Sequence, residues 1–254
     1  MQDIPIIILC GGRGVALGDP PVRTLKPLVE IAGQPMVCHV LKHYVAAGFR
    51  RFLLALGGQQ ALFASALKES LGGDWAPDGA LLCTSLSSNP VTLELIETGA
   101  QTTTGDRVQK LAERLGPAAS FGVAYSDTLC SVDLAKVASA HLAHQKIATL
   151  VGARVPVRFR VLGIRLGETL VRGFAARPVI LNDYINGGYY FFRREVLGAP
   201  YLGGRGTGVV LENEVLEALA AAEQLVAFPY EGGWQYLDAE RHVPLLEKLA
   251  RSGV

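Results

Sequence analysis

The sequence lacks the charge imbalance that would point to a polyanionic partner. Its 24 lysines and arginines face 23 aspartates and glutamates, which leaves a formal net charge of +1. The basic surface typical of nucleic-acid or acidic-membrane binding is therefore not expected. The first apolar run is too short for a signal or a membrane span, and no basic residue precedes it. We expect small-molecule partners, no nucleic acid, no membrane and a cytoplasmic location.

Cysteines are few and scattered. Cys10, Cys38, Cys83 and Cys130 have no paired spacing, which argues against a zinc site or a redox dithiol and favours small buried side chains in a reduced compartment. Internal repeats, low-complexity tracts and linkers are also missing. Half of the 254 residues are hydrophobic, which predicts one domain with a large core.

Apolar runs alternate with helical patterns along the chain, and this alternation predicts an α/β fold. We expect a Rossmann-like, mostly parallel mixed sheet flanked by helices. Residues 72–104 are predicted as loops or a small sheet with short strand-like pieces at 80–84 and 91–96, and residues 155–193 as antiparallel hairpins. The predicted strands are 4–9, 51–56, 120–125, 147–153 and 225–228. The predicted helices are 35–48, 59–71, 106–115, 134–145, 212–223 and one from 239 onward.

Behind the first strand lies the glycine-rich stretch CGGRGVALGDPPVRTLKP, residues 10–27. Its glycines resemble a dinucleotide-binding fingerprint, but that motif needs a helix to begin among them. Gly18, Pro20 and Pro21 oppose such a helix, and the second strand ends without a ribose-binding carboxylate. The Gly-Lys-Ser/Thr of a Walker loop is missing. Two interpretations stay open: a long, mobile loop that wraps a triphosphate with Arg13, Arg23 and Lys26, or a solvated surface loop.

Further motifs follow in a characteristic order. They are LCGGRG, KPLVEIAGQPMVCHVLKHYVAAGF, TTTGDRVQKL, YSDTLCSVDLAKVASAHLAH, YINGGYYFF and GGWQYLD. As a set, they make the chain resemble the sugar-1-phosphate nucleotidyltransferases, most closely the glucose-1-phosphate cytidylyltransferases. The resemblance implies the nucleotide-diphospho-sugar transferase fold, with residues 1–153 mainly binding nucleotide and 154–254 mainly binding acceptor. It also implies CTP as donor, a phosphorylated acceptor, release of pyrophosphate and a homo-oligomer.

The resemblance also implies a set of site residues. Asp127 and Asp238 match the metal-binding aspartates, which would hold Mg²⁺ against phosphates; by local sequence alone they are turn or cap residues. The candidate catalytic cations are Lys26, Arg13 and Arg23. The candidate nucleotide-binding residues are Gly11, Gly12, Gly14, Gln59, Thr104, Gly105 and Arg107. The candidate acceptor-binding residues are Arg160, Arg177, Asn186, Gly187 and Glu212.

Several positions depart from the family pattern. Ala16 stands where the loop arginine that braces the triphosphate is expected, and Ser126 replaces a glycine. Ala176 removes a sugar-binding glutamate, and Arg160 adds a cation near the sugar. These changes predict either an enzyme with an altered phosphate or phosphonate acceptor, or an impaired nucleotide-binding homologue. We further expect His141 and His144 on a solvated helix face, and Trp234 and Tyr236 in the core or a pocket wall.

Overall fold

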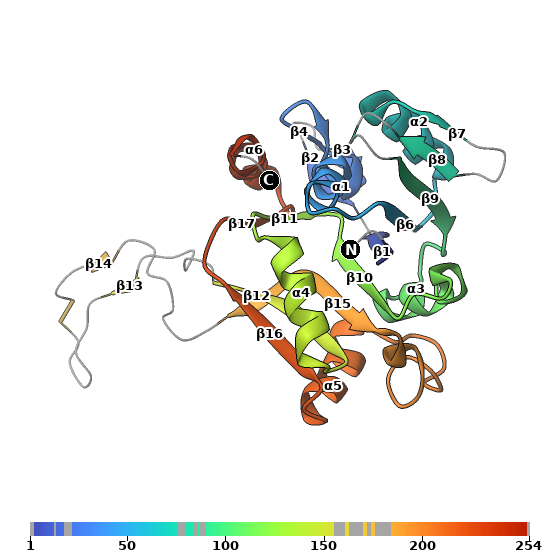
Figure 1. Cartoon of the computed structure of the whole chain (residues 1–254). Coiled ribbons are helices and arrows are strands. Elements are labelled where there is room, and N and C mark those ends of the chain that lie inside the picture. Colours follow the sequence, from blue (N-terminus) through green and yellow to red (C-terminus); the bar gives the residue numbers. More distant parts are fainter. Residues whose placement is uncertain are drawn as a thin grey trace.

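A computed structural model gives the fold of the chain (Figure 1). It describes residues 3–12, 14–17, 22–75, 80–83, 86, 90–154, 161–162, 170–171, 174–175 and 184–252. Arg13, Arg160, Ala176 and Arg177 lie outside these residues. Within the described part, every helix is too short or too polar to cross a membrane.

A central sheet carries the fold, with strand order β16-β12-β15-β10-β1-β6-β9-β8-β7. Only β15 and β8 run against the direction of the other strands. This confirms the predicted mixed, mostly parallel sheet. The strands are β1 (Ile6–Cys10), β6 (Arg51–Leu56), β7 (Asp74–Trp75), β8 (Ala80–Cys83), β9 (Val91–Glu97), β10 (Ser120–Tyr125), β12 (Ala148–Ala153), β15 (Ile185–Arg193) and β16 (Leu225–Tyr230).

Helices cover both faces of the sheet. The α-helices are α1 (Met36–Ala46), α2 (Gln60–Leu71), α3 (Thr104–Lys110), α4 (Leu134–His144), α5 (Glu217–Ala221) and α6 (Val243–Arg251). The 3-10 turns are η1 (Lys26–Leu28), η2 (Glu113–Leu115), η3 (Arg194–Leu197) and η5 (Glu240–His242), and the π-helix is η4 (Leu211–Leu216).

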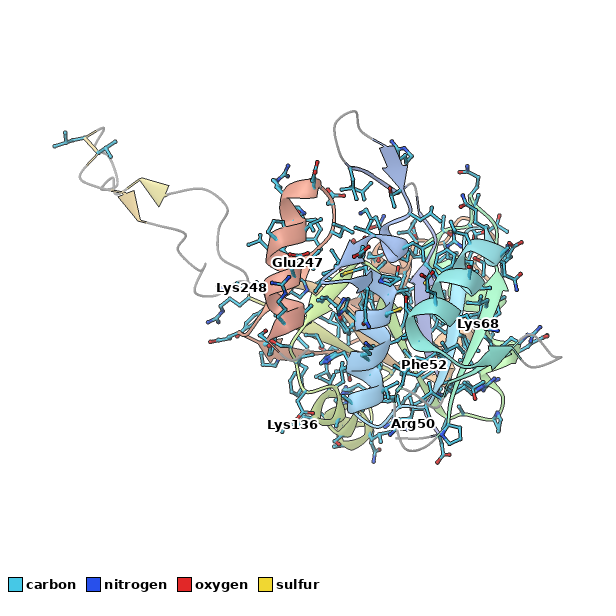
Figure 2. All side chains as sticks on the ribbon, turned by 90° about the horizontal axis from the view of Figure 1, so that it is seen from above. Arg50, Phe52, Lys68, Lys136, Glu247 and Lys248 are labelled. Carbon is cyan, nitrogen blue, oxygen red and sulfur yellow. The ribbon has the colours of Figure 1, made fainter. Side chains whose placement is uncertain are left out.

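Strand β1 is buried on both faces, as its continuous apolar run predicts. Ile6 and Ile8 join one core with α1, α2, α4 and α6, whereas Ile7 and Leu9 join the other with α3, η4 and α5. Seen from above, α1 lies between α6 and α2, and Phe52 lies inside the body of the molecule (Figure 2). This two-faced burial fixes the register of β1 and thus the point at which the glycine-rich stretch begins.

Within the described residues, four two-stranded sheets accompany the central sheet. They are β2 (Val15–Leu17) with β3 (Val22–Thr24), β4 (Glu30–Ile31) with β5 (Gln34–Pro35), β11 (Thr128–Cys130) with β17 (Trp234–Tyr236), and β13 (Val161–Leu162) with β14 (Phe174–Ala175). The first pair corrects the prediction of a long, irregular loop, because part of the glycine-rich stretch is paired as antiparallel strands. The first helix after β1 within the described residues is the turn at Lys26, which removes the basis for a dinucleotide fingerprint.

Three further predictions need correction. The strand-like pieces predicted at 80–84 and 91–96 form β8 and β9, but both belong to the main sheet, with β9 parallel to β6, rather than to loops or a separate small sheet. Strand β15 is a long strand between β10 and β12 rather than a hairpin piece, because Gly187 and Gly188 let its backbone pass close to Val151 and Tyr125. The helix predicted from 106 to 115 starts at Thr104 and ends at Lys110, before a separate 3-10 turn.

The predicted solvated face of α4 is also wrong. His141 is fully buried, and its Nδ1 lies 2.9 Å from Thr149 Oγ1, which also contacts Nε2 of His144 at 2.7 Å. Burial lowers the pKa of His141 to about 4. The prediction of small buried side chains holds for Cys10, Cys38 and Cys130, which lie in the core.

Candidate active site

The candidate site lies where the parallel strands β1, β6 and β10 end. Their register pairs Leu9 with Tyr125 and Cys10 with Leu56, so the three carboxyl ends meet at one edge of the sheet. Open α/β sheets bind ligands at this edge. The glycine-rich stretch continues from β1 there, and Ser126 ties the end of β10 to β1 by donating from Oγ to Leu9 O at 2.7 Å.

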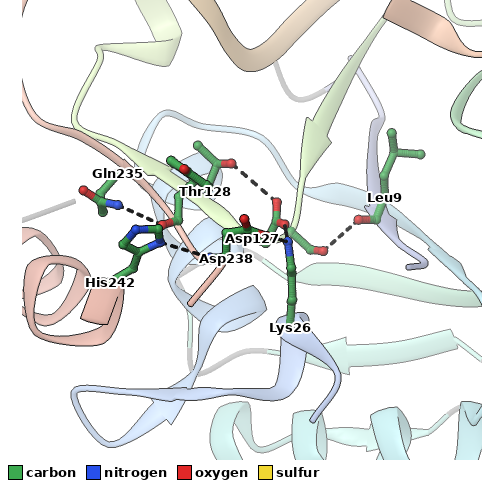
Figure 3. Close-up of polar contacts among 9 residues, drawn as sticks. Leu9, Lys26, Asp127, Thr128, Gln235, Asp238 and His242 are labelled. Atoms are coloured by element: carbon green, nitrogen blue, oxygen red, sulfur yellow. Dashed lines mark hydrogen bonds and ion pairs between the residues drawn. The ribbon is translucent and has the colours of Figure 1, made fainter. Parts of the chain in front are cut away.

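Three charged side chains from distant parts of the sequence converge at this edge (Figure 3). Lys26 Nζ donates to Asp127 Oδ2 and to Asp238 Oδ1, both at 3.1 Å. Because both oxygens contact one nitrogen, the two carboxylates stand no further apart than twice that distance. The structure thus brings together the predicted metal-binding pair and the predicted loop-end lysine.

The small sheet β11–β17 creates this convergence. Thr128 pairs with Tyr236, and Leu237 N donates to Asp127 O at 2.8 Å. Asp127 and Asp238 therefore flank the same end of one antiparallel ladder. The Asp238 amide donates in turn to Nδ1 of His242 at 3.2 Å. His242 was not among the predicted site residues. Its position four residues after Asp238, at a turn before a helix, is the sequence feature that could have indicated a site role.

The lysine is held as a cation. Burial alone would lower the pKa of Lys26, but the charges of Asp127 and Asp238 and the hydrogen bonds to them outweigh burial and raise that pKa. The side chains of Lys26 and Asp127 are about three-quarters buried, at 25% and 24% exposure, whereas Asp238 is 60% exposed. Water therefore screens the Lys26–Asp127 pair less than it screens Asp238.

Two cavities meet at Asp127 and Tyr125. One, of about 100 Å³, is lined by the glycine-rich stretch and Lys26, with Gly11, Gly12 and Gly14 among its walls. The other, of about 270 Å³, is lined by Thr128, Asn186, Gly187, Gly188, Trp234 and Tyr236. This confirms Trp234 and Tyr236 as pocket wall. Trp234 Nε1 donates to Gly187 O at 2.9 Å, and Asn186 Oδ1 accepts from Gly188 N at 3.0 Å. A third cavity, of about 660 Å³, lies around Asp3, at the opposite edge of the sheet.

The hairpin β2–β3 sets the position of Arg23. Its register pairs Ala16 with Arg23, and residues directly opposite in a ladder share one face. The stem of Arg23 lies close to Gly14, because a Cβ added at Gly14 would lie 3.4 Å from Arg23 Cγ. Arg23 is therefore the direct register partner of the position where the loop arginine is expected.

Arg107, a candidate nucleotide-binding residue, is 3% exposed and joins the ends of three strands. Its Nη1 donates to Leu56 O at 2.9 Å and also to Thr98 Oγ1, and its Nη2 donates to Gly99 O at 3.0 Å. The guanidinium packs directly against Gly11, where a Cβ would collide with it. Burial lowers the pKa of Arg107. The observed contacts of its guanidinium are thus to the protein's own backbone and to Thr98.

The other candidate nucleotide residues form a second group. Thr104 Oγ1 donates to Glu212 Oε2 at 3.0 Å and accepts from Leu211 N at 2.8 Å, and Gly105 N donates to Val209 O at 3.0 Å. The structure thus joins Glu212, a candidate acceptor residue, to Thr104 rather than to the cavity around Asn186. Gln59, in a left-handed conformation with φ of 61°, begins α2 at the end of β6.

The donor set at Lys26 fits a magnesium ion. Asp127 and Asp238 already converge on one cation, and their oxygens are the hard ligands that Mg²⁺ takes. Among the described residues, no cluster of three or more His, Cys, Asp and Glu side chains could hold a metal ion. A carboxylate pair completed by substrate phosphates and water is a usual arrangement for Mg²⁺.

A mixed α/β sheet with a glycine-rich stretch, a lysine and two aspartates at its carboxyl edge defines a nucleotide-dependent phosphoryl-transfer type of protein. The chain belongs to the nucleotidyl transferase family, which it matches over residues 6–237. The predicted nucleotidyltransferase class is confirmed.

Named relatives agree with this family. The chain is 29% identical to the glucose-1-phosphate cytidylyltransferase of Salmonella typhimurium strain LT2, over 97% of this chain and 96% of that protein. It is also 29% identical to a mannose-1-phosphate guanyltransferase of Yarrowia lipolytica, over 90% of this chain and 59% of that protein. The fold resembles the solved inositol-1-phosphate CTP transferase from T. maritima, with a TM-score of 0.67, 15% identity and coverage of 100% and 98%.

Proposed function

We propose that the chain is a magnesium-dependent cytidylyltransferase that transfers CMP from CTP to a sugar 1-phosphate or to a related phosphate or phosphonate. The observation that carries this proposal is the convergence of Lys26, Asp127 and Asp238 where the two cavities meet. A transfer reaction needs two anionic substrates side by side, with their charges neutralised at the point of contact. CTP is favoured because the cytidylyltransferase relative is matched over nearly its whole length.

Each group then has a defined task. The triphosphate would lie along Gly11, Gly12 and Gly14, with Lys26 and Arg23 as cationic partners, and the acceptor would fill the cavity beside Asn186. A phosphate oxygen of the acceptor attacks the α-phosphorus, the bond to the β-phosphate bridging oxygen breaks, and pyrophosphate leaves. Asp127 and Asp238 would hold Mg²⁺, which neutralises charge on the phosphates when bound.

A turnover assay tests this proposal. Pyrophosphate release should be measured with CTP, GTP, ATP and dTTP against glucose 1-phosphate, other sugar 1-phosphates and a small phosphonate. We expect CTP to give the highest rate with at least one acceptor. Asp127→Asn should lower that rate about a hundredfold or more. A different preferred triphosphate would refute the cytidylyl assignment, and efficient use of glucose 1-phosphate would refute the altered acceptor.

A second candidate, an impaired nucleotide-binding or regulatory homologue, is favoured by Ala16 alone. It predicts that calorimetry detects binding of CTP with Mg²⁺ while no acceptor yields pyrophosphate. Arg23, opposite Ala16 in the hairpin register, argues for activity because it supplies a cation close to Gly14. If the second candidate holds, Ala16→Arg should restore pyrophosphate release.

A further inference from the structure

Arg154 joins the ends of three neighbouring strands at the carboxyl edge of the sheet. It directly follows β12, and its backbone N–H donates to Tyr230 O at 2.8 Å, at the end of β16. Its Nη1 lies 2.6 Å from Glu231 Oε1, and its Nη2 donates at 3.0 Å to the hydroxyl of Tyr184, just before β15. That hydroxyl donates in turn to the same Glu231 oxygen at 3.3 Å. Each of the three side chains therefore contacts the other two.

The Arg154 guanidinium is suited to a fixed position. Its side chain is only 18% exposed, so water screens its contacts less than those of a surface ion pair. The central guanidinium carbon lies 4.7 Å from the centre of the Tyr184 ring, which adds a cation–π contact. A planar fork of donors serves a carboxylate and a hydroxyl at once, whereas a lysine offers a single mobile ammonium. Arg154 therefore holds Glu231 and Tyr184 in one defined arrangement.

Both partners of Arg154 belong to segments that line the cavity of about 270 Å³. Tyr184 comes two residues before Asn186, which is one wall of that cavity. Glu231 comes three residues before Trp234, which is another wall. The cluster thus joins the two wall segments outside the cavity itself.

The segment that carries Trp234 needs such an anchor. Two glycines separate Glu231 from Trp234, and glycine restricts the backbone less than any other residue. The position of the indole therefore depends on contacts on either side of these glycines. After them, Trp234 Nε1 donates to Gly187 O at 2.9 Å. Before them, the contact is the ion pair of Glu231 with Arg154.

We propose that Arg154 is a positioning residue for the acceptor. By holding Glu231 and Tyr184, it fixes the two segments that carry the cavity walls relative to each other. This inference rests on the proposed function for the identification of the cavity as the acceptor site. Arg154 acts through its two partners and does not itself bind the acceptor.

Steady-state kinetics with each substrate varied tests the proposal. Arg154→Met should raise the acceptor KM about tenfold, because misplaced walls weaken acceptor binding, and should leave the KM for CTP nearly unchanged. Glu231→Ala should reproduce this effect, and the double variant should add little to either single change. Arg154→Lys, which keeps the charge without the planar fork, should recover part of the loss. An unchanged or lower acceptor KM in Glu231→Ala would overturn the proposal, because Arg154 would then not act through Glu231.

The fluorescence of Trp234 tests the same point without turnover. The chain has two tryptophans, so Trp75→Phe leaves Trp234 as the only one. In that background, Arg154→Met should raise the acrylamide quenching constant of Trp234 and shift its emission to longer wavelength. Unchanged quenching and emission would overturn the proposal. This readout needs no acceptor, so it separates a failure of the inference from a failure of the proposed function.

Arg51→Met is the matched control. It removes another guanidinium–carboxylate pair, in which Arg51 Nη2 lies 3.0 Å from Glu94 Oε1, at the opposite edge of the sheet. It should change neither the acceptor KM nor the quenching of Trp234, and effects equal to those of Arg154→Met would overturn the proposal. Circular dichroism checks that each variant is folded. Because the Glu231 side chain is 62% exposed, Glu231→Ala carries both readouts if Arg154→Met does not fold.

Discussion

Gly11→Ala is the substitution that most directly tests the packing beneath the candidate nucleotide site. A Cβ at this position would collide with Cζ and Nη2 of Arg107 and lie 2.7 Å from its Nε, whereas ordinary contacts start near 3.4 Å. The guanidinium would have to move by about an ångström, although it is buried. That movement would break its hydrogen bonds to Leu56 O and Gly99 O.

The expected cost follows from these bonds. Hydrogen bonds to charged groups are worth about 1.5 to 3 kcal/mol each, and a buried cation without partners costs more. Because part of the network can relax, we expect Gly11→Ala to lower the free energy of unfolding by about 3 kcal/mol. In a domain of this size, that corresponds to a decrease in Tm of about 6 to 12 °C.

The control is the neighbouring Gly57→Ala. There a Cβ would lie 3.4 Å from Gly11 Cα and 3.7 Å from Arg107 Nη2, which are normal contacts. Urea unfolding of both variants, alone and combined with Arg107→Ala, gives the coupling energy. We expect Gly11→Ala to cost little once Arg107 is gone, with a coupling of about 2 kcal/mol. Equal stability of Gly11→Ala and Gly57→Ala, or full additivity with Arg107→Ala, would refute the reasoning.

Three further predictions concern other parts of the chain. Arg23→Ala should raise the KM for the triphosphate about tenfold, because one charge-assisted hydrogen bond is lost, and adding Ala16→Arg should recover part of this loss. Steady-state kinetics with each substrate varied measures both effects, and a change in the acceptor KM alone would contradict the prediction. Between about pH 6.5 and pH 4, His141 should lower the free energy of unfolding by about 3 kcal/mol, because burial lowers its pKa to about 4 while the unfolded chain takes up the proton at the ordinary pKa. Urea unfolding against pH should show this loss as the difference between the wild type and His141→Phe. Asp133→Ala removes the side chain that accepts from Lys136 N at the start of α4 and should cost about 1 kcal/mol by urea unfolding; an unchanged midpoint would argue against the cap.

Local sequence predicted the strands that are buried on both faces. Strands β1, β6 and β10 are short apolar runs bounded by turns, and this pattern needs no tertiary information. Strand β15 was not predicted as one long strand, because its start, Ile185-Asn186-Gly187, is neither apolar nor alternating. Its place between β10 and β12 depends on close backbone approach at Gly187 and Gly188. Such an approach depends on the partner strands and cannot be seen in the segment itself.

The candidate site was predictable only through the resemblance to a family. Nothing near Asp127 or Asp238 distinguishes a metal ligand from a turn residue, since their approach comes from the pairing of β11 with β17, segments about a hundred residues apart. Lys26 meets them only because the hairpin β2–β3 ends two residues before it.

Position 16 shows why a departure from a motif must be judged in three dimensions. In the linear sequence, Ala16 stands where the family pattern has an arginine, and Arg23 lies seven residues away. In the hairpin the two positions are direct partners in the register, and Arg23 lies close to Gly14 of the glycine-rich stretch. Gly11 also has a structural role, because the absence of a side chain at this position makes room for the guanidinium of Arg107 and not only for a phosphate. The shape of the stretch therefore depends on close packing against a buried guanidinium of the protein itself, and the proposed triphosphate site has to be compatible with that packing.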